Sequence, residues 1–377
     1  MFKVIPPGGT PFQIKYLIKS YFTVSSTKEK FMQEYLEGGD IFFTSSGRMA
    51  LYLILKALRK SHPQRDRVII PAYTCPVIPR IIQSLGMKVL LSDLEKDTLF
   101  MAKKQVERLW DEKTLCLLPV HLFGYPHPLW KEFPCVEDAA QALGAEAGGR
   151  KTGTRGIAGF FSLGKGKNLT TDKGGIIFTR DDKLSREIGK ELTTYEFLNP
   201  LPSFIRLLLF SLLIKPWGWG IITNLNLPQE ETSEFFPERK KLSSFQQKLL
   251  YLQLGDYPKL IKERDKRAKL LQKHLTSFPQ VKLIAPIKDS KPCYLRFPIL
   301  VKRKRARLEK LFLNKGWGVT RMYEKSIPEV YPRIYINQGD KFPSARALSR
   351  ELLTLPTLGY TEEKAAEDLK WIKERWS

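Results

Sequence analysis

The sequence predicts an α/β fold in which helices cover both faces of a mostly parallel sheet, followed by a smaller α+β domain. From Asp40 to Arg180, short apolar runs without polar alternation recur between helical stretches. Such runs are typical of strands that are buried on both faces of a parallel sheet. Beyond Ser243 the pattern changes to a long helix, a strand and further helices, which is typical of α+β order. We therefore expect a large domain over residues 1–242 and a small C-terminal domain over 243–377.

The expected elements follow from these patterns in chain order. In the large domain, apolar runs predict strands at 41–46, 67–74, 88–93, 114–120, 134–139, 159–163 and 174–179. Apolar residues at helical spacing predict helices through 49–58 and 77–85, between the first three strands. In the C-terminal domain, the same criteria predict a helix at 243–275, a strand at 294–301 and helices at 305–314 and 362–375.

The composition is that of a globular protein with a strong excess of positive charge. The 377 residues suffice for two domains, and 42% hydrophobic with 27% charged residues argue against a disordered or fibrous chain. The chain has 63 Lys and Arg against 39 Asp and Glu, which gives a net charge of +24. Such an excess attracts polyanions, meaning phosphorylated ligands, anionic lipid surfaces or nucleic acid.

The cysteines and histidines indicate neither a disulfide framework nor a metal centre. Four cysteines lie far apart without a CxxC pair, and His121 and His127 are the only histidines close in sequence. We therefore expect no metal site and a reducing, cytoplasmic location. Because the first residues lack the apolar core of a signal peptide, we expect no such peptide.

Thr44-Ser45-Ser46-Gly47-Arg48 is the first of three segments that can carry chemistry. It places the end of a strand directly before the N-terminus of a helix. Free backbone N–H groups and the positive end of the helix dipole favour a phosphate there. Gly47 would let a ligand approach the backbone, and Ser46 and Arg48 would add donors. A plain helix cap is the alternative interpretation.

The second segment, Val136-Glu137-Asp138-Ala139-Ala140-Gln141-Ala142, has a carboxylate at the end of a buried strand. Ligands of α/β sheets bind at the carboxyl ends of strands. An isolated buried aspartate is costly, so Asp138 needs a cationic partner. A pyridinium nitrogen would serve, and a nearby arginine or lysine is the alternative.

The third segment runs from Phe161 to Thr171 and holds two lysines among glycines, in the order Gly164-Lys165-Gly166-Lys167. A lysine in such a turn can bond covalently to an aldehyde cofactor if burial or nearby cations lower its pKa. A solvated basic loop is the alternative. The nucleotide-binding pattern GxxxxGK[ST] is not matched, because Asn168 follows Lys167.

Together, the three segments resemble the DegT/StrS family of sugar aminotransferases, which use pyridoxal 5'-phosphate (PLP) and have the aspartate-aminotransferase-like fold, fold type I. Their order and the 29 positions from Asp138 to Lys167 both match. Further matching text lies at 70–74 (IPAYT), 119–124 (PVHLFG), 167–171 (KNLTT) with 174–175 (GG), and 353–357 (LTLPT). The resemblance extends from about Asp40 to the C-terminus, apart from an insertion at 199–228.

The resemblance implies a role for each matching residue. Lys167 is similar to the lysine that holds the aldehyde carbon of the cofactor, and Asp138 to the partner of the ring nitrogen. Gln141 is similar to the residue near the phenolic oxygen. The implied phosphate ligands are Ser46, Gly47, Arg48 and Ser162.

Two departures from the family text concern the surroundings of the cofactor. Cys75 stands where relatives commonly have an aromatic residue that stacks on the ring. Arg239 stands near the position of an asparagine that reaches the phosphate of the neighbouring subunit, and a guanidinium could do the same with more charge. The family implies a homodimer with shared active sites.

The resemblance implies transfer of an amino group from an amino acid, glutamate in many relatives, to a keto sugar that is linked to a nucleotide. Relatives in which histidine replaces the lysine act as dehydratases, so Lys167 favours transamination. After the amino donor displaces it, the free amine could carry the proton between two carbons. The alternatives are a catalytically altered protein of this fold, a membrane-associated scaffold, and an aminotransferase for a lipid-linked acceptor.

The insertion contains the most apolar stretch of the chain, at 203–222. Pro216 breaks any helix there, so a span of about 20 residues through a bilayer is excluded. Apolar residues go nearly all the way round the expected helix, and Trp217 and Trp219 are of a type found at lipid headgroups. Docking on an anionic membrane surface, packing in a subunit interface and covering the substrate are the three interpretations.

A basic run, Lys302 to Arg307, begins the helix expected at 305–314. A solvated helix face is the simpler interpretation, and nucleic-acid binding is the other. No signature of a nucleic-acid-binding fold accompanies the charge, so we expect no nucleic-acid partner.

Overall fold

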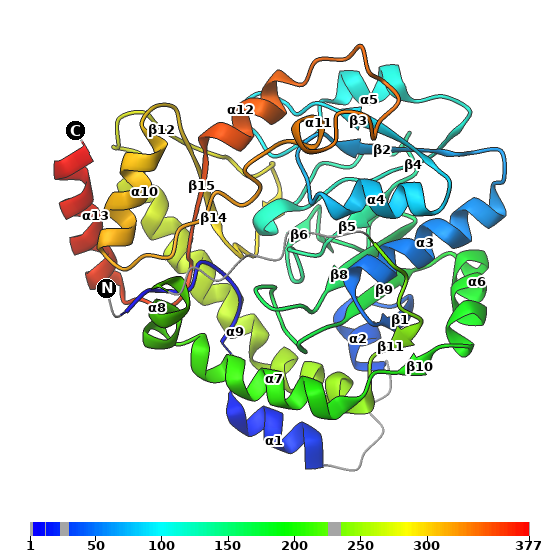
Figure 1. The fold of residues 1–377 in the computed structure, drawn as a ribbon, viewed down its shortest axis with the longest axis horizontal. Coiled ribbons are helices and arrows are strands. Elements are labelled where there is room, and N and C mark those ends of the chain that lie inside the picture. The colour runs from blue at the N-terminus through cyan, green and yellow to red at the C-terminus, as the bar shows by residue number, and fades with distance from the viewer. Residues whose placement is uncertain (1–2, 12, 23–29, 225–234, 377) are drawn as a thin grey trace.

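The computed structural model describes residues 3–11, 13–22, 30–224 and 235–376, and Figure 1 shows its arrangement. Four strands form one part of the central sheet, in the order β1 (Asp40–Thr44), β9 (Gly175–Thr179), β8 (Ala158–Ser162) and β5 (Val136–Asp138). Three strands form the other part, in the order β3 (Lys88–Ser92), β2 (Arg67–Pro71) and β4 (Thr114–Leu117). Parallel bridges from Leu117 to Cys135 and from Val120 to Asp138 join the two parts.

The sheet confirms the predicted fold class, with one strand reversed. β2 runs parallel to β3 and β4, and β5 runs parallel to β8. β9 runs antiparallel to both of its neighbours, β1 and β8. Every residue of β9 is buried, so its apolar run looks the same in the sequence whichever way the strand runs.

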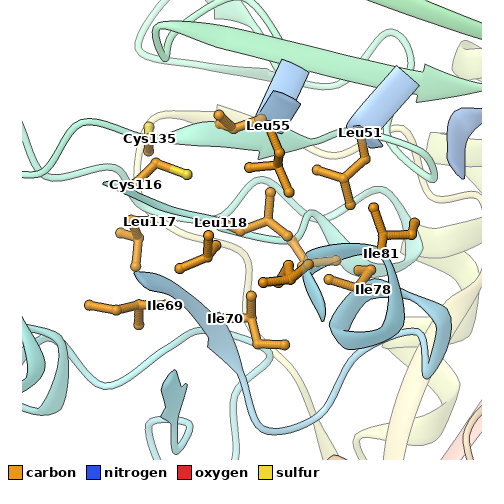
Figure 2. Packing of buried hydrophobic residues seen from close by; sticks show 14 of the residues in the cluster. Leu51, Leu55, Ile69, Ile70, Ile78, Ile81, Cys116, Leu117, Leu118 and Cys135 are labelled. Carbon is orange, nitrogen blue, oxygen red and sulfur yellow. The ribbon is translucent and has the colours of Figure 1, made fainter. Parts of the chain in front are cut away.

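Helices of the N-terminal half pack their apolar faces on this sheet. They are α2 (Lys30–Tyr35), α3 (Gly47–Ser61), α4 (Val77–Ser84), α5 (Lys103–Leu109) and α6 (Asp182–Thr193). Figure 2 shows Leu51 and Leu55 of α3 and Ile78 and Ile81 of α4 pointing toward the residues of β2 and β4. This packing fixes the N-terminus of α3 at the carboxyl end of β1.

The C-terminal part begins with the long helix α9 (Ser244–Leu275), which Ser243 and Gln246 cap reciprocally. It continues with a sheet in the order β12 (Val281–Leu283), β14 (Phe297–Val301) and β15 (Leu352–Leu355). The helices there are α10 (Arg305–Asn314), α11 (Ile327–Val330), α12 (Pro343–Glu351) and α13 (Glu362–Trp376). Ile5 belongs to the core of this part and bridges to Trp317, although it lies near the N-terminus. The division into two domains stays a prediction.

Short elements complete the fold. They are β6 (Glu146–Ala147), β7 (Arg150–Lys151) and β13 (Ser290–Lys291), which form one small sheet, β10 (Glu196–Phe197) paired with β11 (Lys240–Lys241), and the 3₁₀ helix at Leu122–Gly124. The strand expected at 294–301 begins only at Phe297, because Tyr294 has a left-handed φ of 44° and the carbonyls of Tyr294 and Leu295 accept hydrogen bonds from Arg264.

The insertion forms α7 (Pro200–Leu213) and α8 (Pro216–Asn224), and α1 (Ile14–Phe22) lies beside α7 along one edge of the molecule (Figure 1). Residues 225–228 of the expected insertion lie outside the described residues. In the described part of the chain, no helix is long and apolar enough to cross a membrane.

The basic run is partly used inside the protein. Lys302 forms ion pairs with Asp97 at 2.6 Å and Glu351 at 2.7 Å. Arg305 donates to the carbonyl of Ser349 at the end of α12, at 2.7 Å. Arg303 and Lys304 are exposed, as expected for a solvated face.

Candidate cofactor site

The first predicted segment lies where β1 and β8 end and β9 begins. Ser46 bridges to Gly174, and Ser162 is opposite Gly175. Gly47 opens α3 so close to β8 that an added Cβ would lie 3.0 Å from the Cβ of Ser162. The backbone N–H groups at the start of α3 and the hydroxyl of Ser162 therefore face a common space that only a glycine leaves open.

Ser46 is also the helix cap that the sequence allowed as an alternative. Its hydroxyl oxygen accepts a hydrogen bond from the backbone N–H of Met49 at 3.1 Å. The hydroxyl proton is left to donate to a ligand. Arg48 is exposed in the first turn of α3, and its charge lies near enough to lower the pKa of Lys167.

Asp138 ends β5 with a carboxylate that is 6% exposed. Its Oδ1 accepts one hydrogen bond, from the backbone N–H of Ala140 at 2.9 Å. No cation lies within ion-pairing distance of it among the described residues. Burial accordingly raises its pKa to about 6, against the hydrogen bond from Ala140 and the charge of Lys167, which lower it.

Glu137, one residue earlier, has the opposite surroundings because successive side chains of a strand point to opposite faces. Its carboxylate accepts from the backbone N–H groups of Arg155 at 2.6 Å and Gly156 at 2.9 Å, from His121 at 2.9 Å and from the Arg155 guanidinium at 3.2 Å. Burial alone would raise the pKa of Glu137, but the His121 hydrogen bond and the Arg155 charge bring it to about 2. Glu137 and both histidines are therefore structural.

Lys167 lies in the loop between β8 and β9, next to Asp138. Burial lowers the pKa of its amine, and the charges of Arg296 and Arg48 lower it further, whereas Cys75 and Asp138 act in the other direction. No acidic side chain forms an ion pair with Lys167 in the part of the chain that the structure describes. A partly buried amine with a lowered pKa is the form of lysine that acts as a nucleophile.

Gln141 lies three residues after Asp138, and its side chain binds the backbone. Its Oε1 accepts a hydrogen bond from the N–H of Phe123 at 3.0 Å, and Phe123 has a left-handed φ of 59°. Gln141 thus holds the loop that follows Pro119 in place. Its expected proximity to the phenolic oxygen of the cofactor stays a prediction.

Arg239 is exposed beside β11, whose backbone borders the first segment. The carbonyl of Lys240 accepts from the N–H of Ser45 at 3.0 Å. The charge of Arg239 acts on Glu191 and Tyr195 of its own chain. Arg239 thus precedes a residue that borders the first segment, and its contact with the cofactor or a second subunit stays a prediction.

Three residues near the site were not predicted from the sequence: Tyr73, Arg296 and Tyr323. The Tyr73 hydroxyl donates to the carbonyl of Tyr323 at 3.1 Å, and burial raises the pKa of Tyr323 well above its ordinary value, with Cys75 and Asp138 adding to the effect. Arg296 donates to Thr320 at 2.9 Å, and burial lowers its pKa to about 10. Tyr73 lies in the matching text at 70–74 but had no role assigned to it, and Arg296 and Tyr323 are single residues far from the predicted segments.

These side chains fit PLP. The unpaired Asp138 carboxylate suits a protonated ring nitrogen, and the Lys167 amine suits an aldehyde. The start of α3 with Ser162 suits a phosphate. Two buried oxygens have no hydrogen-bond partner among the described residues: Asn168 Oδ1, next to Lys167 in sequence, and Thr74 Oγ1, next to Cys75.

A separate cleft lies elsewhere in the described chain. It encloses about 190 Å³ between residues 6–11, the turn from α7 to α8 and residues 356–359. Arg264 lies at its wall and binds the carbonyl of Gly9 at 2.8 Å. None of the predicted site residues lines this cleft, so it is separate from the candidate cofactor site.

Comparison with known proteins decides the family. The model of the DegT/DnrJ/EryC1/StrS aminotransferase family matches residues 22–370. The chain belongs to this family. The expected family is therefore confirmed.

Individual relatives agree with this family assignment. A UDP-4-amino-4-deoxy-L-arabinose–oxoglutarate aminotransferase of Shewanella sediminis is 34% identical over 154 residues, which cover 39% of each chain. The chain spans only 39–45% of the length of the curated relatives it matches.

Solved structures of family members share the fold. Helicobacter pylori PseC, an aminotransferase of pseudoaminic acid biosynthesis, superposes with a TM-score of 0.74 at 18% identity, over 100% of this chain and 99% of its own. An Escherichia coli GDP-4-keto-6-deoxy-D-mannose-3-dehydratase with bound hydrated PLP gives 0.77 at 15% identity, over 100% of both chains. Fold type I is therefore confirmed, and PLP is the cofactor of this family.

Proposed function

We propose that this protein is a PLP-dependent aminotransferase that moves an amino group from glutamate to a keto sugar carried on a nucleotide. The proposal rests on Asp138 and Lys167, two groups of opposite charge type at the carboxyl edge of the sheet. Neither has an ion-pair partner among the described residues. A buried carboxylate and a buried amine without ion-pair partners are costly unless a ligand completes them. PLP bound between them would supply an electron sink for the bond broken at the α-carbon of the amino acid.

Asp138 would keep a proton on the ring nitrogen. Its carboxylate accepts one hydrogen bond from a backbone N–H and can accept more, and its raised pKa means that burial makes the ionised form costly, a cost that a cationic partner would offset. Ser46, Gly47, Arg48 and Ser162 would hold the phosphate, through the N–H groups at the start of α3, two hydroxyls and one guanidinium.

Lys167 would bond to the aldehyde carbon and, once the amino donor has displaced it, move a proton at the substrate carbon. Its lowered pKa favours the neutral amine that both tasks require. Relatives with histidine at this position are dehydratases, so the lysine supports transamination over loss of water.

The substrate classes rest on relatives. The Shewanella sediminis relative is named for an amino sugar and oxoglutarate, the keto acid that glutamate leaves behind. PseC acts in the biosynthesis of an amino sugar. We therefore take glutamate as the donor and a nucleotide-linked keto sugar as the acceptor.

The test is to incubate the PLP-loaded protein with ¹⁵N-labelled glutamate and a panel of 3-keto and 4-keto nucleotide sugars, and to analyse the products by mass spectrometry. We expect one labelled amino sugar and an equal amount of 2-oxoglutarate, and neither from Lys167→Ala. Loss of water from the sugar without gain of nitrogen would identify a dehydratase instead. No product from any sugar, together with no 2-oxoglutarate, would contradict aminotransferase activity.

A further inference from the structure

Helix α7 differs from an ordinary surface helix, because it turns serines toward the protein and several large apolar side chains toward the outside. Toward the protein it buries Ser203, Leu207 and Ser211, so two of these three side chains are hydroxyls. Away from the protein it exposes leucine and isoleucine, with Leu209 56% and Ile205 49% exposed. A helix that only covered the core would place its leucines inward. The outer side of α7 is therefore built to be covered.

Polar contacts with a buried aspartate explain why serines of α7 face inward. Ser203 donates to Oδ2 of the buried Asp172 at 3.1 Å, and Arg206 donates to the same oxygen at 2.8 Å. Ser211 donates to the carbonyl of Leu208 at 2.7 Å. The Ser211 bond lies within α7, whereas the two bonds to Asp172 fix the rotation of the helix, so the outward leucines cannot turn into the core.

Neighbouring helices extend the exposed surface. Phe22 at the end of α1 is 72% exposed and Trp217 of α8 is exposed as well. We use the term apolar face for Phe22, Ile205, Leu208, Leu209, Leu212 and Trp217. Exposed apolar surface that is contiguous marks an interaction site.

The three helices form one unit. Tyr21 of α1 packs its ring 4.6 Å from that of Phe204 of α7, and Leu17 shares a buried cluster with Leu207. The N–H of Val4 donates to the carbonyl of Pro216 at 2.8 Å, which ties α8 to the N-terminal segment. Figure 1 shows α1, α7 and α8 along the same edge of the molecule.

The charge of the three helices indicates the occupant. Their sequences contain Lys15, Lys19 and Arg206 but no Asp or Glu, and Lys215 lies between α7 and α8. Among the described residues, Asp172 accepts a hydrogen bond from Arg206 and Asp256 accepts one from Tyr16. A two-fold contact with a second copy would set the same basic helices of a chain of charge +24 against each other. An anionic surface complements them instead.

We propose that the apolar face docks on an anionic lipid bilayer surface, with the protein lying on the membrane and not spanning it. The outward leucines enter the region between headgroups and acyl chains, and Trp217 sits at headgroup depth. Lys15 and Lys215, which are exposed, contribute attraction to anionic headgroups. The helices α1, α7 and α8, with 9, 14 and 9 residues, are too short to cross the bilayer.

The test is co-sedimentation of the PLP-loaded protein with vesicles of equal parts phosphatidylcholine and phosphatidylglycerol. The variant Ile205→Ser, Leu209→Ser, Leu212→Ser is compared with wild type. The matched control, Leu313→Ser with Ile336→Ser, replaces residues that are 40% and 43% exposed elsewhere. We expect the ratio of bound to free protein to fall at least about tenfold for the triple variant and to stay unchanged for the control. Binding should weaken on phosphatidylcholine alone and at high salt.

Thermal unfolding and PLP absorbance of each variant keep the result independent of folding, since the three substituted side chains point away from the protein. Equal pelleting of wild type and triple variant, or no pelleting of wild type, would overturn the proposal. A wild-type dimer that becomes a monomer in the triple variant, without vesicle binding by either, would show that the apolar face is a contact between copies.

Discussion

Glu137 and Asp138 are consecutive on β5, yet the first carboxylate accepts four hydrogen bonds and the second accepts one. The strand turns them to opposite faces, one toward Arg155 and His121 and the other toward Lys167. The protein itself supplies the hydrogen-bond donors of Glu137, whereas the carboxylate of Asp138 keeps acceptor positions for a ligand. Substituting each of the two residues in turn therefore distinguishes a structural role from a cofactor-binding role within one strand.

The protein without cofactor should be stabilised at neutral pH by Asp138→Asn. Near pH 4 the carboxyl is protonated in the folded chain and about half protonated in the unfolded chain, so variant and wild type should differ little in stability. As the pH rises through about 6, the wild type alone loses stability, because its folded-state pKa is raised to about 6 from 3.8. At pH 8 the variant should be more stable by about 3 kcal/mol, as an upper value. Urea unfolding at pH 4 and pH 8 measures this difference.

Glu137→Gln is the matched control for that experiment. Its folded-state pKa is lowered to about 2, so the stability it contributes is present at neutral pH and is lost as the pH falls toward 2. The variant should be less stable than wild type at pH 8, because a buried and fully bonded charge is removed. Equal effects of the two substitutions at pH 8 would contradict the distinction between them.

Asp138→Asn should slow amination strongly while keeping some bound PLP. A neutral amide cannot hold a proton on the ring nitrogen, so the electron sink is weakened. We expect a loss on the order of 10²-fold or more in the rate with glutamate, which is about 3 kcal/mol of barrier. Stopped-flow absorbance of the half-reaction with glutamate alone measures it. An unchanged rate would contradict the assigned role.

PLP should be attached to Lys167 and to no other lysine. Reduction with borohydride, digestion and mass spectrometry should find the cofactor on the peptide that contains Lys167, and the Lys167→Ala protein should bind PLP without becoming covalently labelled. Lys165→Ala is the control, since Lys165 lies two positions away and pairs with Asp172 at 3.4 Å. Labelling of Lys165 in the wild type would refute the assignment.

The local elements could be predicted from the sequence because periodicity and caps determine them. The helix at 305–314 was predicted with the bounds that the structure has, and Ser46 and Ser243 mark helix starts in both. The direction of β9 could not be predicted, since a strand buried on both faces has no directional pattern. The late start of β14 depends on Tyr294 and on Arg264, which lies in another helix.

The candidate site was predictable to the extent that its residues lie in motifs. Asp138 and Lys167 stand in text that matches a family, and the structure brings them together. Arg296 and Tyr323 come from the C-terminal half as single residues without spacing, so only the three-dimensional fold places them beside Lys167 and Cys75. The outward turn of the leucines on α7 likewise depends on Asp172, a contact between distant segments.

Active sites shared between two subunits should show in mixtures of inactive variants. If Arg239 of one subunit reaches the phosphate bound by the other, a hybrid of Lys167→Ala and Arg239→Ala chains contains one site with both residues intact. Mixing should then recover activity above either parent, up to about a quarter of wild type for random pairing and one intact site per hybrid. Activity after unfolding and refolding the mixture measures this. Absence of recovery, with dimers present by light scattering, would show that Arg239 acts within its own chain or not at all.

Arg206 should stabilise the loop of Lys167 through Asp172. The guanidinium of Arg206 lies 2.6 Å from Oδ2 of Asp172, and Lys165 approaches Oδ1 of the same carboxylate at 3.4 Å. In Arg206→Ala, the buried Asp172 carboxylate keeps only the longer ion pair with Lys165 and the hydrogen bond from Ser203. Because Arg206 is partly exposed, we expect a loss of about 1–2 kcal/mol in the free energy of unfolding, below that of a fully buried pair.

The double variant Arg206→Ala, Asp172→Asn tests the cause. If the loss comes from an incompletely paired buried charge, removing that charge as well should cost less than the sum of the two single losses. Arg206→Lys should recover part of the stability, and the dissociation constant of PLP should rise several-fold in Arg206→Ala because the loop also carries Lys167. Additive losses, or a PLP affinity that stays unchanged while stability falls, would show that α7 supports the fold without holding the cofactor loop.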